Sequence, residues 1–286
     1  MFDAVVAQLI SRVAPRRALD VGTGAGKYGH LLARHAPDCQ RTGIEVEARH
    51  VQPFGLAERY DPLVVECVTQ WWRRTPGENF DLVVIGDCIE HLPKSAALDL
   101  LNALVYRCAW LVLLAPEFIV QPATGGVPSE AHVSMWSERD LHWHDLWAWD
   151  NCRAITFAVL RGYQPATLTL QQLVDALNTA NLPLQHFDGQ TFVRSARLRL
   201  VEHRREVNYR PLWAPPRPGC AQPAPRGGQA KWPSNICLRA ARAAGQRPTT
   251  PASAANSSAK PIDSAEWAEA SRNRITAPPA ASSNSG

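Results

Sequence analysis

The sequence predicts an α/β fold with a doubly wound, mostly parallel sheet that carries helices on both faces. Three observations support this prediction. Short apolar runs alternate with helical segments through residue 120. The runs 82–85 and 110–116 are apolar throughout, which is typical of parallel strands covered on both faces. The segment 18–21 leads directly into a glycine-rich turn, a feature that brings the backbone close to a ligand.

The first two elements are a helix over residues 3–13 and a strand over residues 18–21. The helix presents one apolar face, formed by Val5, Val6, Leu9, Ile10 and Val13. Residues 22–26 after the strand read Gly-Thr-Gly-Ala-Gly, and such a turn suits a nucleotide-like ligand. Asp20 inside the strand only accepts hydrogen bonds when ionised, so it disfavours a pyrophosphate and favours a ligand with an ammonium group and hydroxyls.

Three known glycine loops compete for this segment. The phosphate-cradling loop is excluded, because it needs a glycine at Val21 and a serine or threonine at Tyr28. A dinucleotide fingerprint fits Gly24, Gly26 and Gly29, but it would begin two residues after the strand has ended. The pattern h-h-D-h-G-x-G-x-G, which ends at Gly26, fits without such an offset. In this register the segment resembles motif I of the class I S-adenosylmethionine-dependent methyltransferases.

The second strand is predicted over residues 41–47 and carries Glu45 at its carboxyl end. Glu45 follows Gly26 by 19 residues, which allows a helix of about four turns to return the chain to an adjacent parallel strand. A carboxylate at this place can accept two hydrogen bonds from vicinal ribose hydroxyls. NAD-binding and S-adenosylmethionine-binding folds share this device, so Glu45 predicts a nucleoside site without identifying the nucleoside.

Residues 80–92, Phe-Asp-Leu-Val-Val-Ile-Gly-Asp-Cys-Ile-Glu-His-Leu, resemble motif IV of the small-molecule methyltransferases, F-D-x-h-x-x-x-D-h-h-E-H-L. The strand 110–116 resembles the one that follows in that family. Together the motifs cover residues 1–163 and imply the seven-strand type of methyltransferase sheet, with S-adenosyl-L-methionine as cofactor. The resemblance implies cofactor contacts from Asp20, Gly22, Thr23, Gly24, Gly26, Glu45, Asp87 and Cys88.

The third strand departs from the family pattern. The family often places an acid there that binds the adenine amino group, whereas segment 62–68 offers Glu66 or Cys67. Because strand side chains alternate between faces, a shift of one residue decides which of the two faces the cofactor. Cys67 is the candidate for cofactor binding, with adenine recognition then resting on backbone groups, and the register stays open.

A general base is needed only if the methyl acceptor is a hydroxyl or a protonated amine. His91 and His132 are the candidates, because an imidazole titrates near neutral pH. Alternatively, His91 caps the following helix and touches only the cofactor. No metal site is expected, since His142 and His144 point to different faces of a helix and no cysteine cluster accompanies them.

The segment from 121 to 160 is predicted to comprise a Gly- and Pro-rich loop, a helix and a final strand. The loop carries His132 and Trp136, and a wall of the acceptor site competes with simple packing as the role of these two residues. Ser137 begins a capping box that predicts the helix, on which Trp143 and Trp147 would pack onto the sheet. The strand is expected at 154–160.

The chain is predicted to divide into a methyltransferase domain at 1–163, an extension at 164–213 and a disordered tail at 214–286. A helix at 170–180 and a hairpin turn at Asp188-Gly189 define the extension. The tail is rich in Pro, Ala, Arg and Ser and has too few large apolar residues to bury. Residues 1–163 hold 15 Lys and Arg against 19 Asp and Glu, and residues 164–286 hold 15 against 7. The part of the chain after residue 163 is therefore basic, and we expect the tail to solubilise the protein.

The motifs of nucleic-acid base methylation, [DN]-P-P-[YFW] and Pro-Cys, are missing after the fourth strand. We therefore expect the acceptor to be a small metabolite, a sugar, a lipid head group or a peptide side chain. No apolar stretch approaches the ~20 residues that a membrane span needs. Seven cysteines without a C-x-x-C pair favour free thiols and a cytoplasmic location. Two alternatives remain, an NAD(P)-dependent Rossmann oxidoreductase and an inactive methyltransferase fold that serves as a binding module. The sequence identifies neither the acceptor nor the oligomeric state.

Overall fold

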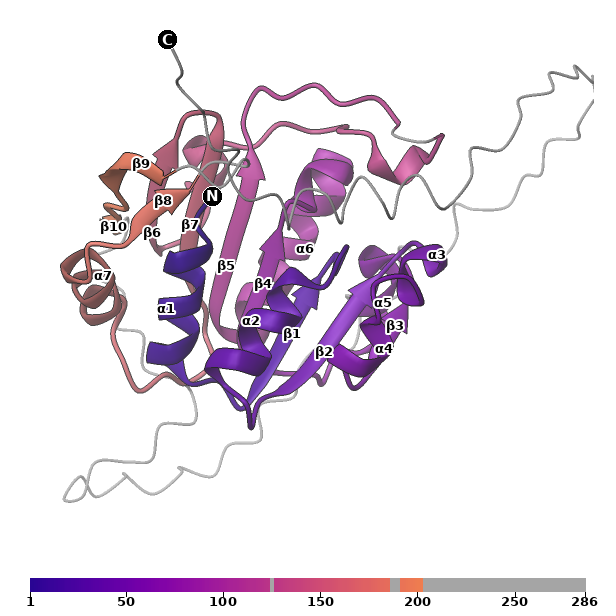
Figure 1. Cartoon of the computed structure of the whole chain (residues 1–286), viewed down its shortest axis with the longest axis horizontal. Coiled ribbons are helices and arrows are strands. Elements are labelled where there is room, and N and C mark those ends of the chain that lie inside the picture. Colours follow the sequence, from indigo (N-terminus) through magenta and orange to yellow (C-terminus); the bar gives the residue numbers. More distant parts are fainter. Residues whose placement is uncertain (124–125, 186–190, 203–286) are drawn as a thin grey trace, which may run out of the picture.

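An eight-stranded sheet with the order β3-β2-β1-β4-β5-β7-β6-β10 forms the centre of this computed structural model (Figure 1). The structure describes residues 1–123, 126–185 and 191–202. The strands of the sheet are β1 (Arg17–Val21), β2 (Gln40–Glu45), β3 (Leu63–Val65), β4 (Phe80–Gly86), β5 (Cys108–Pro116), β6 (Leu146–Cys152), β7 (Ile155–Arg161) and β10 (Arg199–Glu202). Strands β1 to β5 are parallel, and β7, β6 and β10 are joined by antiparallel pairing.

Seven α-helices accompany the strands in the described residues. They are α1 (Asp3–Val13), α2 (Lys27–His35), α3 (Ala48–Val51), α4 (Leu56–Arg59), α5 (Val68–Arg74), α6 (Lys94–Arg107) and α7 (Leu170–Thr179). Short 3₁₀ turns follow at η1 (Ile89–His91), η2 (Pro128–Glu130) and η3 (Glu138–Leu141). A separate antiparallel pair consists of β8 (Pro183–Gln185) and β9 (Thr191–Ser195).

Strand β4 shows why the sheet is covered on both faces. Its side chains alternate, so that Leu82 and Val84 join one apolar cluster while Val83 and Ile85 join the other. Helices α1, α2 and α7 contribute to the first cluster, and α5 and α6 contribute to the second. All four side chains are fully buried. The predicted doubly wound, mostly parallel fold is therefore confirmed.

The strand order reverses between β1 and β4, because the chain moves outward through β2 and β3 before it returns to β4 and β5. Open α/β sheets bind their ligands at the carboxyl ends of the strands at such a reversal. The turn 22–26 follows β1, and Asp87 follows β4, so both border this point. The fold therefore brings together the two segments that the motifs single out.

The predicted helix at 3–13 and the helix near 170–180 are confirmed, as are the strands around 82–85, 110–116 and 154–160. The prediction of a helix after Ser137 was wrong. The capping box forms with Asp140, but only the single 3₁₀ turn η3 follows it. Trp147 is buried on β6 instead, and Trp143 is 81% exposed. An i, i+4 spacing of two tryptophans thus arose from a turn followed by a strand.

The extension contributes to the main sheet, because β10 pairs with β6 at its edge. The predicted turn at Asp188-Gly189 and the predicted tail at 214–286 lie outside the described residues. The division of the chain at residue 163 stays a prediction. No helix in residues 1–123, 126–185 or 191–202 is both long and apolar enough to cross a lipid bilayer.

The ring of Phe157 on β7 is fully buried and stacks on Phe2 with a centroid distance of 4.9 Å. We expect Phe157→Ala to lower the free energy of unfolding by about 3–5 kcal/mol, because it leaves a cavity between α1 and the sheet. Phe118→Ala is the matched control, since Phe118 is 73% exposed and should lose little stability. Urea unfolding followed by circular dichroism measures both, and equal losses would contradict the packing described.

Candidate functional site

The turn after β1 folds around three left-handed glycines. Gly22, Gly24 and Gly26 have φ of +73°, +50° and +76°, values that side chains with a Cβ rarely adopt. The amides of Gly22 and Thr23 both donate to the carbonyl of Ile44 on β2, at 2.9 and 3.1 Å. A Cβ on Gly22 would lie 2.4 Å from Sγ of Cys88, whereas a Cβ on Gly24 would meet no atom within 4 Å. Gly22 is thus required by the packing, and Gly24 borders open space.

Glu45 at the end of β2 is 4% exposed and holds this turn in place. Its Oε2 accepts from the Gly24 amide at 2.8 Å and from the Thr23 hydroxyl at 3.1 Å. Its Oε1 accepts from the Glu47 amide at 2.9 Å and lies 3.4 Å from Nδ1 of His50. Burial alone would raise the pKa of Glu45, but His50 and the two amides lower it overall. Glu45 is therefore a carboxylate at neutral pH, placed beside the glycine turn as predicted.

Asp20 is fully buried and accepts a short hydrogen bond from the hydroxyl of Tyr60. The same hydroxyl accepts from the Gly29 amide at 2.9 Å, so it links β1 to α2. The second oxygen of Asp20, Oδ1, has no hydrogen-bond partner in the described part of the chain. Burial raises the pKa of Asp20 to about 7, although Tyr60 and Lys27 act in the opposite direction. Asp20 therefore changes charge near neutral pH.

Asp87 and Cys88 follow β4 directly and border the site. Asp87 has a left-handed backbone, with φ of 51°, and its amide donates to Leu114 at 3.0 Å. Its carboxylate lies 3.7 Å from Nζ of Lys27, and that ammonium also lies 3.3 Å from Asp3 of α1. Burial raises the pKa of the Cys88 thiol well above its ordinary value, so the thiol is neutral.

Glu66 and Cys67, which the sequence left as alternatives, both follow β3 and have different partners. The Glu66 carboxylate forms an ion pair with Arg74 of α5. Cys67 is the residue before α5, and its Sγ lies 3.1 Å from the hydroxyl of Thr69. Cys67 as the residue on the cofactor side stays a prediction.

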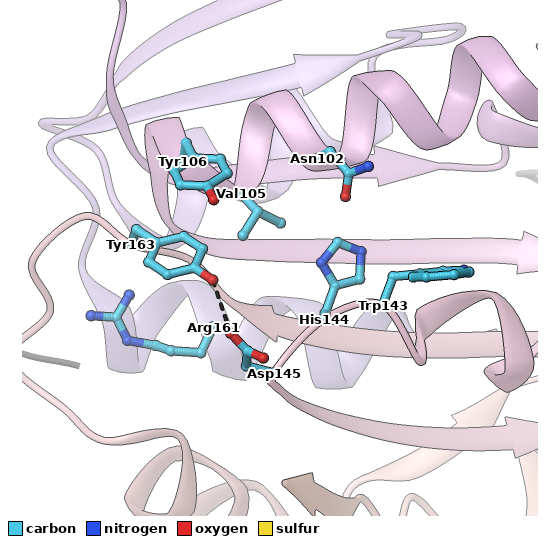
Figure 2. Close-up of a pocket in the computed structure, with 8 residues that line it drawn as sticks. All are labelled: Asn102, Val105, Tyr106, Trp143, His144, Asp145, Arg161 and Tyr163. Carbon is cyan, nitrogen blue, oxygen red and sulfur yellow. Dashed lines mark hydrogen bonds between the residues drawn. The ribbon is translucent and has the colours of Figure 1, made fainter. Parts of the chain in front are cut away.

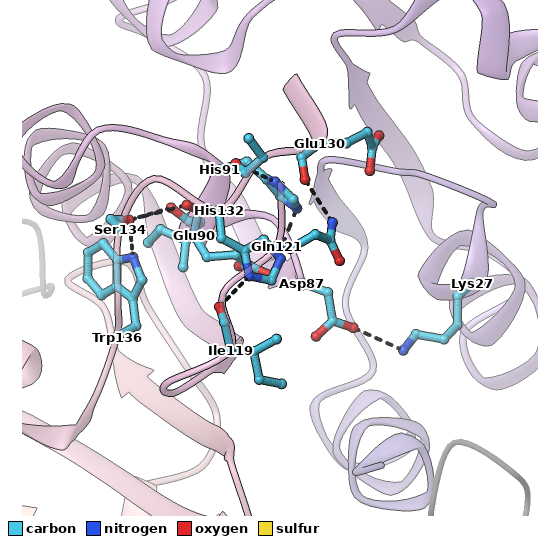
Figure 3. Close-up of polar contacts among 12 residues, drawn as sticks. Lys27, Asp87, Glu90, His91, Ile119, Gln121, Glu130, His132, Ser134 and Trp136 are labelled. Atoms are coloured by element: carbon cyan, nitrogen blue, oxygen red, sulfur yellow. Dashed lines mark hydrogen bonds and ion pairs between the residues drawn. The ribbon is translucent and has the colours of Figure 1, made fainter. Parts of the chain in front are cut away.

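Glu90, His91 and His132 cluster near Asp87 (Figure 3). Oε1 of Glu90 lies 4.0 Å from Nε2 of His91 and 4.0 Å from Nε2 of His132. The two imidazole rings approach edge to face, with centroids 4.9 Å apart. Burial raises the pKa of Glu90 to about 8, and burial lowers the pKa of His91. The two histidines predicted as bases are thus neighbours, and both face a carboxyl group that was not predicted as a site residue.

A cavity of about 540 Å³ opens at the carboxyl end of β5, and residues 135–139 contribute to its lining. Its walls include Trp136, whose indole NH donates to the Ser134 hydroxyl at 2.9 Å, and Asn151, whose amide donates to Glu117 at 2.8 Å. This volume is in the range of small-molecule pockets, about 300–1,000 Å³. Backbone amides of residues 133 and 134 donate to the carbonyl of Glu90, so the wall and the cluster are joined.

A second cavity, of about 80 Å³, lies near the amino end of β5, where Arg161 of β7 pairs with that strand (Figure 2). Tyr163 stacks on Tyr106 at 4.6 Å and donates to Asp145 at 3.0 Å. The cavity is below the size range of ligand pockets. It is also remote from the glycine turn, so we assign it no part in the site.

The structure brings predicted residues together at the carboxyl ends of β1, β2 and β4. These residues are Asp20, Glu45, Asp87, Cys88 and the glycine turn. Sequence reasoning missed Tyr60 and Glu90. Glycines inside a helix and a strand, Gly29 and Gly43, were the available signal for Tyr60, because such glycines mark close packing of another group. Glu90 stood within the motif but was not assigned a role.

No protein-family profile matches the chain, and no curated protein sequence matches it. Among solved structures it is similar to a SAM-dependent methyltransferase of Archaeoglobus fulgidus, with 14% identity, a TM-score of 0.43 and coverage of 56% of this chain and 94% of the other. An O-methyltransferase family protein of Burkholderia thailandensis has 16% identity and a TM-score of 0.43; the match covers 56% of this chain and 55%, about half, of that protein. An N-methyltransferase of Bradyrhizobium japonicum has 17% identity and a TM-score of 0.39, covering 56% of this chain and 93% of the other. Likenesses of this size establish no shared activity.

The buried carboxyl of Asp20 should make stability depend on pH. Between pH 3.8 and about 7 the folded protein keeps a proton on Asp20 that the unfolded chain releases. The free energy of unfolding therefore falls as the pH rises through this window, by up to ~4 kcal/mol from this group. Asp20→Asn should show a correspondingly weaker decline, measured by urea unfolding between about pH 4 and pH 8.

Asp99→Asn, which makes the same chemical change at an exposed position of α6, is the control for this measurement. If the curves of the wild type and Asp20→Asn run parallel across the window, the proton is not held by Asp20.

Proposed function

We propose that this protein is a methyltransferase that moves a methyl group from S-adenosyl-L-methionine to a small-molecule acceptor. The observation that carries the proposal is the glycine turn at the strand-order reversal. There Gly24 borders open space while Glu45 of the neighbouring strand accepts its amide hydrogen. The motifs that resemble those of the methyltransferases support the choice of cofactor.

The residues at this edge fit an S-adenosylmethionine molecule chemically. Oδ1 of Asp20 is a buried acceptor without a partner in the described residues, which suits an ammonium group or a bridging water. Glu45 accepts hydrogen bonds from donors that ribose hydroxyls can replace or join. Gly22, Gly24 and Gly26 leave the main chain bare beside the ligand. Asp87, Cys88 and Cys67 complete the proposed contacts.

When bound, the cofactor supplies a methyl group on a positively charged sulfur. The chain has to hold the acceptor in line with that methyl group and exclude water, and such positioning supplies ~7–11 kcal/mol of a barrier. The 540 Å³ cavity, with Trp136 in its wall, is the proposed acceptor pocket. His91 stands on the turn after β4, and His132 stands on the loop that carries Trp136. An imidazole nitrogen there can take a proton from a hydroxyl acceptor.

Replacement of Gly24 tests the cofactor site. Gly24→Ala should weaken S-adenosylhomocysteine binding by about tenfold or more, or ~1.4 kcal/mol, because the new methyl group enters the space that the ligand needs. Gly55→Ala is the matched control, because Gly55 has φ of +58° and also lies in open surroundings, but stands outside the turn. Both variants carry the same left-handed backbone cost of ~1–2 kcal/mol, so only the ligand separates them.

Isothermal titration calorimetry against S-adenosylhomocysteine and NAD⁺ provides the measurement. Binding of S-adenosylhomocysteine alone supports the proposal. Binding of NAD⁺ alone would establish the oxidoreductase alternative, and the absence of binding by either ligand would leave a binding module.

A further inference from the structure

The carboxyl group of Glu90 is buried without the hydrogen bonds that burial requires. Glu90 is 1% exposed, and its Oε2 has no partner among the described residues. Its Oε1 faces the Nε2 atoms of His91 and His132, both at 4.0 Å (Figure 3). A direct hydrogen bond between such groups is about 2.7–3.2 Å long, so these three atoms converge without bonding to one another.

Nδ1 of each imidazole already has a backbone carbonyl as its hydrogen-bond partner. Nδ1 of His91 lies 3.1 Å from the carbonyl oxygen of Ala131, and Nδ1 of His132 lies 2.9 Å from that of Ile119. A carbonyl only accepts hydrogen bonds, so each Nδ1 carries the proton and each neutral ring presents a bare lone pair at Nε2. Backbone carbonyls orient metal-binding histidines in this way, by fixing the tautomer from behind.

We propose that Glu90, His91 and His132 form a binding site for one divalent transition-metal ion. Three ligand atoms that face one another without hydrogen bonds between them can share one cation, and these atoms all lie within 4.8 Å of one another. The backbone also holds the two halves of the site together. The carbonyl of Glu90 accepts the amides of Val133 and Ser134 at 2.9 and 3.0 Å, which ties the His132 loop to the end of β4.

The donor set indicates the class of ion. Two imidazole nitrogens and one carboxylate suit zinc, manganese, iron(II) or cobalt, whereas magnesium and calcium prefer oxygen ligands. Three protein ligands leave coordination positions open, as in catalytic rather than structural sites. Sequence patterns did not connect these residues, because 41 positions separate His91 from His132.

The site lies three residues from Asp87 on the same turn. If the proposed function holds, an ion here offers its open coordination positions to an oxygen atom of the acceptor. The substrate class is then narrowed to molecules that carry such an oxygen. This part rests on the proposed function, whereas the metal site itself does not. An imidazole that binds an ion through Nε2 cannot also take a proton there, so the inference replaces the direct base role of the two histidines.

Metal binding by the full chain tests the inference. The chelator-treated protein is titrated with Zn²⁺, Mn²⁺ and Co²⁺ in a calorimeter, and the visible spectrum of Co²⁺ reports nitrogen coordination. We expect one ion per chain. Glu90→Gln and His132→Phe should each weaken binding by more than the ~10–100-fold that loss of an outer-shell partner costs. His30→Gln is the control, because it removes an exposed imidazole on α2 that is outside the site.

Circular dichroism checks that each variant is folded. Because two variants are used, the test still holds if one of them fails to fold. Failure of the wild type to bind any of the three ions, or binding that persists in both variants, would overturn the inference. S-adenosylhomocysteine binding is measured on the same samples. Its absence from the wild type would remove the proposed function and leave the metal site standing.

Discussion

The geometry of the site depends on one buried side chain, Tyr60. Its ring occupies the space beside Gly29 of α2 and Gly43 of β2, where a Cβ would approach to 2.5 and 2.6 Å. Its hydroxyl donates to Asp20 of β1 and accepts from the Gly29 amide. One phenol thus sets the spacing of three elements below the glycine turn. Because each backbone approaches it closely, the ring constrains the arrangement of the turn.

Much of this architecture was predictable, because its causes are local. Continuous apolar runs identified β4 and β5, since strands covered on both faces have no solvent-facing side to mark with polar residues. Glu45 was predictable from its distance along the chain, because a helix and its return to the sheet need a defined number of residues. The error at Trp143 and Trp147 has the same origin. A spacing of four satisfies a helix, but here a turn and a strand produced it.

The proposed acceptor side was less predictable, because it is built from contacts between distant segments. Glu90 has its role only because the loop that carries His132 folds back onto the end of β4. No local pattern encodes that return, and the two carbonyls that orient the histidines belong to irregular backbone. The edge strand β10 was also unassigned, since a short strand with half-exposed residues has little periodicity. Residue types suggested the chemistry, but long-range packing decided which atoms converge.

The two layers of charge around the glycine turn differ in their exposure to solvent. Lys27 sits between Asp3 and Asp87, and these three side chains are about 40–50% exposed, so added salt screens them. Asp20 and Tyr60 are shielded from mobile ions by burial. Ionic strength therefore acts on the outer layer alone. Raising it would loosen the link between α1, α2 and the turn after β4, while the arrangement beneath the glycines stays as it is.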